Sequence, residues 1–184
     1  MDVEAPSELK LLEIPTSDNG TEVLWADVLG GVVHVVSVPV FAYGVSRDAV
    51  ISAQSHGDRL RLVRVLRPSP GATVRIYVAQ DAKASDVYTQ RILPDAREKG
   101  FRIGPATFLD PEIVAFHVAD RAELSPVTAH LDGLAREGVL RFWELGDPPM
   151  SDDGNADDDD SSTKPWELVH QLPVEGQRRG ESQG

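Results

Sequence analysis

Cysteine is absent from this 184-residue sequence, so disulfide bonds, thiolate metal sites and cysteine nucleophiles are excluded. No apolar run approaches the roughly twenty residues of a membrane-spanning helix. The first residues are acidic, whereas a secretory signal begins with positive charge. We therefore predict a cytoplasmic protein.

Patterns typical of enzymes are also missing. The glycines do not form a phosphate-binding loop, and no Gly-x-Ser-x-Gly turn occurs. The histidines share no metal-ligand spacing on one element: His34, His56, His117, His130 and His170. We predict no catalytic residues, no metal and no cofactor, and we expect a binding protein rather than an enzyme.

Acidic residues outnumber basic ones by 30 to 18, which gives a net charge of −12. Residues 151–184 hold nine of the acidic residues and three of the basic ones, and the preceding 150 residues carry the other half of the excess. Because a negative surface repels phosphate backbones, nucleic acid is a disfavoured partner. We expect another protein, of basic character, as the partner.

The two ends of the chain lack the pattern of a packed core. We predict that residues 1–7 are disordered and that residues 147–184 form an acidic disordered tail, since the tract 151–162 is rich in charge and has little to bury. Trp166-Glu167-Leu168-Val169 is an apolar island in this tail. It is predicted either to act as a short binding motif or to dock on its own domain.

Residues 8–70 read as a half built of short antiparallel strands. Strands are expected over 8–14, 21–28 and 59–67, and a valine run from residue 32 follows the Gly30-Gly31 turn as a hairpin partner. Residues 47–54 fit a helix or a strand, and Val50-Ile51 favours a strand. We expect Trp25 in the core and strict alternation of side chains from Arg59 to Arg67.

Residues 71–146, after the boundary Pro68-Ser69-Pro70-Gly71, read as β-α-β-β-α-β. We predict strands over 72–79, 101–108, 112–119 and 139–145. One helix is expected to begin at Ser85, to be disturbed at Pro94 and to end at Gly100, and the other to begin at Ser125 and end at Gly138.

This order is that of a ferredoxin-like unit, in which both helices cover one face of the sheet. We expect the first half to cover the other face. The predicted fold class is α+β: a short antiparallel β-rich N-terminal half packed with a ferredoxin-like (βαββαβ) C-terminal half.

Three segments form a recognisable set: Leu24-Trp25-Ala26, Val38-Pro39-Val40-Phe41-Ala42-Tyr43-Gly44-Val45-Ser46 and Asp48-Ala49-Val50. They resemble a bacterial family of domains of unknown function. In that family a Leu-Trp-Ala strand precedes an Ile/Val-Pro-Phe-Phe-aromatic-Gly-hydrophobic corner and a Gly-Asp-hydrophobic-Val step. Here Arg47 replaces the Gly and Val40 replaces the first Phe. The resemblance spans about residues 8–145; it implies the two-part fold and no activity.

The corner supplies the predicted site residues, Phe41, Tyr43, Ser46 and Asp48, which together with Trp166 are candidates for binding a ligand or partner. The same residues also suit a structural role, with Tyr43 packed in the core and Ser46 or Asp48 capping a turn.

The leading hypothesis is a non-enzymatic protein–protein interaction module, for example an immunity-like or regulator-like protein. The alternative is a small-molecule sensor or enzyme with a pocket at the Phe41–Asp48 corner. A third hypothesis concerns a group of basic residues, which could form a surface that binds nucleic acid. The same residues also suit an exposed strand face whose charge discourages edge pairing. They are Arg59, Arg61, Arg64, Arg67 and Arg75.

Overall fold

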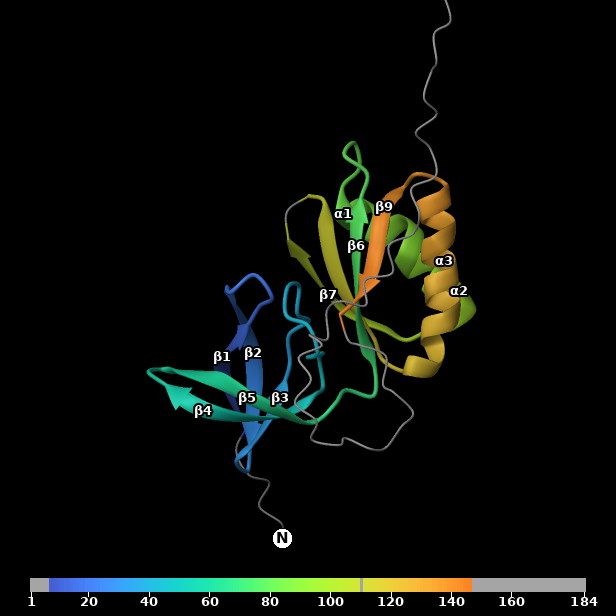
Figure 1. The fold of residues 1–184 in the computed structure, drawn as a ribbon. Coiled ribbons are helices and arrows are strands. Elements are labelled where there is room, and N and C mark those ends of the chain that lie inside the picture. The colour runs from blue at the N-terminus through green and yellow to red at the C-terminus, as the bar shows by residue number, and fades with distance from the viewer. Residues whose placement is uncertain (1–6, 110, 147–184) are drawn as a thin grey trace, which may run out of the picture.

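The computed structural model describes residues 7–109 and 111–146. They form a mixed α+β fold in which a five-stranded barrel is followed by a four-stranded sheet with helices on one face (Figure 1). The predictions made for residues 1–6, for the acidic tail and for the Trp166 segment lie outside the described residues.

The barrel contains the first five strands, and its interior is filled by small and branched apolar side chains from all of them. The strands are β1 (Glu8–Pro15), β2 (Thr21–Leu29), β3 (Val32–Val35), β4 (Val50–His56) and β5 (Arg59–Arg67). Four neighbouring pairs are antiparallel. The parallel pairing of β1 with β5 closes the barrel and was not predicted, because strands so distant in sequence share no turn signal.

Along strand β2 the side chains alternate, with Leu24 and Ala26 buried and Val23 and Trp25 on the outside. The prediction that Trp25 lies in the core is wrong, since half of its surface (50%) is exposed. The interior of a small barrel is narrow and accepts only one face of each strand. On β2 the inner face is the one that carries leucine and alanine.

Strand β5 does not alternate strictly from Arg59 to Arg67, which corrects the prediction. Two register shifts against β4 leave Val63 and Leu66 without a partner, as in β-bulges. Both side chains are exposed. Each bulge adds one residue and resets which side chains face the barrel core.

The second half is a sheet in the order β7-β8-β6-β9, with all neighbouring strands antiparallel. Its helices lie on one face (Figure 1), where they pack on Val74, Ile76 and Phe116. The strands are β6 (Ala72–Val78), β7 (Ile103–Leu109), β8 (Ile113–Val118) and β9 (Leu140–Leu145).

The first helical segment consists of α1 (Ala84–Val87), a π-helical turn η1 (Tyr88–Ile92) and α2 (Leu93–Lys99), and Gly100 ends it in the left-handed conformation. The disturbance expected at Pro94 is this wider turn. Proline has no N–H to donate and its ring needs space in the preceding turn. The residue before α1 is Lys83, so Ser85 is not the cap.

The second helix, α3 (Leu124–Arg136), begins earlier than predicted because a 3₁₀ turn, η2 (Arg121–Glu123), precedes it. Asp120 caps this turn by accepting a hydrogen bond from the Ala122 amide at 2.9 Å. The predicted cap, Ser125, therefore lies inside the helix.

The loop between β3 and β4 contributes to both halves. Val38 and Val40 pack on Ala115 of β8, whereas Ala42 and Val45 belong to the barrel core. The first half thus covers part of the sheet face opposite the helices, as expected.

Gly71 is required where the chain enters the sheet. A Cβ there would lie 2.1 Å from the Val118 carbonyl oxygen and 2.6 Å from the His117 ring. We expect Gly71→Ala to lower the free energy of unfolding by more than about 2 kcal/mol, because the backbone must move. The control is Gly133→Ala in α3, where a Cβ meets nothing within 4 Å; it should stabilise by roughly 0.5–1 kcal/mol. Equal effects in urea unfolding would contradict this.

Candidate functional site

The predicted corner residues make contacts of different kinds where the barrel meets the sheet. Ser46 is buried, and its hydroxyl accepts a hydrogen bond from the Thr73 amide at 3.0 Å and shares another with the Thr73 hydroxyl at 2.8 Å. Asp48 has a left-handed backbone (φ 67°), and its carboxylate lies 3.6 Å from the buried His117 ring. Phe41 is half exposed. Ser46 and Asp48 therefore fasten the corner to the sheet.

Tyr43 leads to a second contact that sequence reasoning missed. Arg75 of β6 was grouped with an exposed basic stretch, but it is completely buried. Its guanidinium lies 4.3 Å from the centre of the Tyr43 ring and donates a hydrogen bond to the Ala42 carbonyl oxygen at 2.5 Å. Nη1 lies 3.6 Å from Oε1 of Glu144. The corner is thereby held to β6 and β9.

Glu144 also accepts hydrogen bonds from two tyrosines, at 2.8 Å from Tyr43 Oη and 3.2 Å from Tyr77 Oη. The Tyr77 ring stacks on Phe142 at a centroid distance of 4.0 Å. Burial, together with the neighbouring Glu144 carboxylate, raises the pKa of Tyr43 to about 12, and burial raises the pKa of Tyr77 as well.

The corner backbone is held from the barrel side by Glu22 of β2. Its carboxylate accepts hydrogen bonds from three consecutive amides, those of Val40, Phe41 and Ala42, at 2.7, 2.9 and 2.8 Å. With these contacts the predicted site residues on the corner act at the junction of the two halves.

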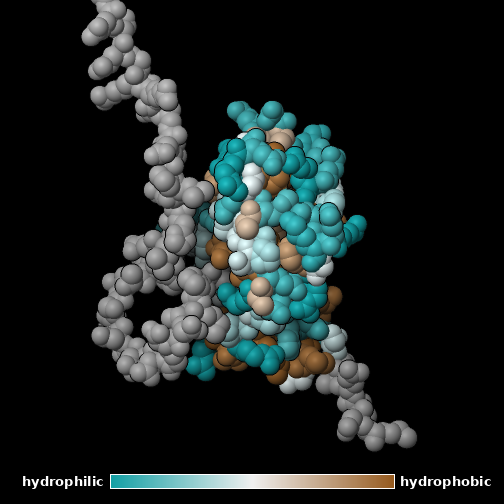
Figure 2. Space-filling model, turned by 90° about the vertical axis from the view of Figure 1, so that its right-hand side faces the viewer, coloured by the Kyte–Doolittle hydropathy of each residue, from teal (hydrophilic) through white to brown (hydrophobic). Residues whose placement is uncertain are grey.

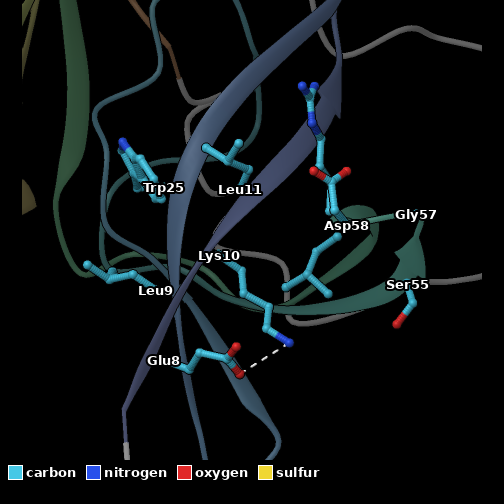
Figure 3. Close-up of a pocket in the computed structure, with 10 residues that line it drawn as sticks. Glu8, Leu9, Lys10, Leu11, Trp25, Ser55, Gly57 and Asp58 are labelled. Atoms are coloured by element: carbon cyan, nitrogen blue, oxygen red, sulfur yellow. Dashed lines mark ion pairs between the residues drawn. The ribbon is translucent and has the colours of Figure 1, made fainter.

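A groove of about 430 Å³ lies on the barrel beside β1 (Figure 3). β1 pairs with β5 only at Leu12 and Glu13, so Glu8–Leu11 diverge from the tip of the β4–β5 hairpin. Figure 3 shows Leu9, Leu11 and Trp25 on one side of β1, and the hairpin residues on the other. The groove is lined by Glu8, Leu9, Lys10, Leu11, Trp25, Ser55, Gly57, Asp58, Arg59 and Leu60.

One side of the groove is apolar and exposed. Leu9 is 60% exposed and Trp25 50%, and Leu11 stands directly opposite Trp25 in the β1–β2 register. Val23, on the same face of β2, is also exposed. Figure 2 shows hydrophobic residues concentrated at the lower end of the molecule, where Figure 1 places the barrel. Contiguous exposed apolar surface of this kind marks interaction sites.

The charges of the groove are almost all paired. Lys10 lies 3.2 Å from Glu8, and Arg59 lies 3.5 Å from Glu13. Within residues 7–109 and 111–146, the Asp58 carboxylate at the hairpin tip makes no ion pair or hydrogen bond. The groove therefore offers one uncompensated negative charge next to apolar side chains.

Glu13 ties the hairpin tip to β1. Its carboxylate is 2.8 Å from His56 Nδ1 and 3.4 Å from Arg61 Nη2, in addition to Arg59. The hydrogen bond with His56 is the main reason that the pKa of Glu13 is lowered, and Arg61 acts in the same direction. Because Arg59 and Arg61 are engaged here, two of the four arginines of β5 are not free for a phosphate backbone.

Three further observations on the described part of the chain bear on function. No group of three His, Asp or Glu side chains there is arranged to hold a metal ion. No helix there has the length and apolar character needed to cross a membrane. The described ranges contain 15 basic and 17 acidic residues, an excess of two, so most of the negative charge lies elsewhere in the sequence.

A comparison with protein families matches residues 22–142, from β2 to β9, to the family described as "Domain of unknown function (DUF4265)". The chain belongs to this family. The match includes Trp25 and the hairpin tip and begins after β1. A solved structure, a hypothetical protein from Neisseria gonorrhoeae, is similar in fold with a TM-score of 0.58 and 12% identity, over 79% of this chain and 96% of that one. A comparison with curated proteins gives no match.

The tyrosines give a titration test of the junction. The raised pKa of Tyr43, about 12 against 10.0 unfolded, means that its protonated form contributes stability that is complete below pH 10 and lost as the pH rises through 12. At pH 10.5, absorbance at 295 nm should show less phenolate in the native chain than the roughly three quarters expected in denaturant for a pKa of 10.0, and Tyr43→Phe should remove one of the late-titrating groups. A native midpoint near 10 for all three tyrosines would contradict this.

The lowered pKa of Glu13 predicts a stability difference that depends on acidity. The pKa lies below the unfolded value of 4.5, so the contribution of the ionised carboxylate is present above that pH and disappears as the pH falls through the lower folded value. Glu13→Gln should therefore lower the melting temperature at pH 6 to 7, and the gap from the unmodified chain should close towards pH 3. A constant gap would show that the charge of Glu13 is not involved.

Proposed function

We propose that this protein is a non-enzymatic binding module that recognises another polypeptide through the outer face of β1 and β2. The observation that carries the proposal is Trp25, a tryptophan on a β-strand, half exposed and flanked by Leu9, Leu11 and a groove. Tryptophan is the residue type most enriched among those that dominate binding energies at protein interfaces.

The charge distribution supports a partner recognised by shape and apolar contact rather than by net charge. The described residues are close to neutral, and the paired ions around the groove leave few charges to attract a strongly basic protein. An immunity-like or regulator-like role in the cytoplasm is the form of this function that we propose, with the partner held on the barrel.

The proposal includes the architecture. We infer that residues 71–146 form a ferredoxin-like unit and residues 8–70 the unit that carries the binding face. The strand order β7-β8-β6-β9, with helices between β6 and β7 and between β8 and β9, supports the first inference.

The test is selection of peptides from a phage-displayed random library on the immobilised full chain, followed by affinity measurements with variants. Trp25→Ala should weaken selected peptides by about thirtyfold, because a buried tryptophan anchor contributes about 2 kcal/mol. Val63→Ala is the matched control, an exposed residue of the same barrel outside the groove. The proposal fails if no peptide is selected, or if both variants bind as the unmodified chain does.

A further inference from the structure

The geometry of the groove points to a specific mode of recognition, which rests on the function proposed above. We infer that the partner contributes an extended segment that adds as a β-strand to the free edge of β1. In this mode its apolar side chains lie beside Leu9 and Leu11, with Trp25 beyond them on β2, and a lysine or arginine reaches Asp58.

The free edge follows from how the barrel closes. All eight residues of β1 pair with β2, but on the other side only Leu12 and Glu13 pair, with Leu60 and Arg61 of β5. Within the described ranges, Glu8–Leu11 therefore have one unpaired edge. An unpaired strand edge presents backbone donors and acceptors at the spacing that another extended chain needs.

The groove lies next to this edge. Its volume of about 430 Å³ lies within the range of ligand sites, which is roughly 300 to 1,000 Å³. The hairpin tip forms the opposite wall, and the contacts of Glu13 with His56 and Arg59 hold that wall in place. A chain entering the groove meets strand edge on one side and hairpin on the other.

The side chains around the groove set the chemistry of the segment. Leu9, Leu11 and Trp25 form an apolar strip on one face, and successive side chains of an added strand point to alternate faces. Every second residue of the partner can therefore be apolar and contact this strip. Asp58, the charge without a partner among the described residues, selects for a basic side chain near the hairpin tip.

The experiment uses the peptides selected on the full chain and two N-methylated series of the tightest one. Each series blocks the amides of alternate residues, so only one series can disturb hydrogen bonds to β1. We expect one series to lose more than about tenfold in affinity and the other to bind nearly unchanged. Asp58→Asn should weaken peptides that contain lysine or arginine by about three- to fivefold, whereas Asp81→Asn, an exposed aspartate outside the groove, should not.

Amide hydrogen exchange of the full chain supplies the second measurement. Those amides of Glu8–Leu11 that do not bond to β2 should exchange rapidly in the free chain and at least about tenfold more slowly with peptide. Slow exchange without peptide would overturn the inference, because the chain itself or a second copy would then occupy the edge.

Failure of this inference and failure of the proposed function can be told apart. Peptides that depend on Trp25 but tolerate both N-methylated series would overturn strand addition and leave the binding face in place. Selection of no peptide at all would overturn both.

Discussion

The buried guanidinium of Arg75 is the contact on which the joining of barrel and sheet depends. An ion taken out of water is costly unless its charge and its donors are satisfied. Here the Glu144 carboxylate and the Tyr43 ring balance its charge and the Ala42 carbonyl oxygen accepts from Nη2, while Nε and Nη1 make no hydrogen bond among the described residues. Two of these three partners lie on the corner loop, so the loop must be in place before the charge can be buried. Gly146 leaves the necessary space, since a Cβ there would lie about 3.0 Å from the guanidinium.

The proposed binding face depends on the short contact between β1 and β5 that closes the barrel. Closure uses two residue pairs between β1 and β5, and Glu13 strengthens it through side chains from the hairpin. The rest of β1 is left free to diverge and to border the groove. The edge that makes a strand prone to aggregation is thus kept short, with Lys10 and Glu8 on it, which is how natural sheets limit unwanted pairing. A short unpaired edge of this kind favours pairing with one specific segment over non-specific aggregation with other strands.

The sequence predicts the individual strands and helices of this fold better than the pairing between strands that are distant in the sequence. Alternation and turn residues are local, and they indicate the β2–β3 hairpin and the strand from residue 50 correctly. Barrel closure, the bulges at Val63 and Leu66, and the groove depend on pairing between distant strands, for which one sequence carries no signal. The exposure of Trp25 and the burial of Arg75 reverse the usual preferences of tryptophan and arginine. Only the tertiary surroundings explain both, and both are central to the functional interpretation.

The loop from β3 to β4 has a consequence for how this molecule can vary. Its side chains are divided between two cores, with Val38 and Val40 on the sheet and Ala42 and Val45 in the barrel. A change of volume at one of these positions must be matched in whichever core receives it, because both interiors are close-packed. The barrel and the sheet are therefore not interchangeable modules. The loop is the segment that contributes side chains to the packing of both.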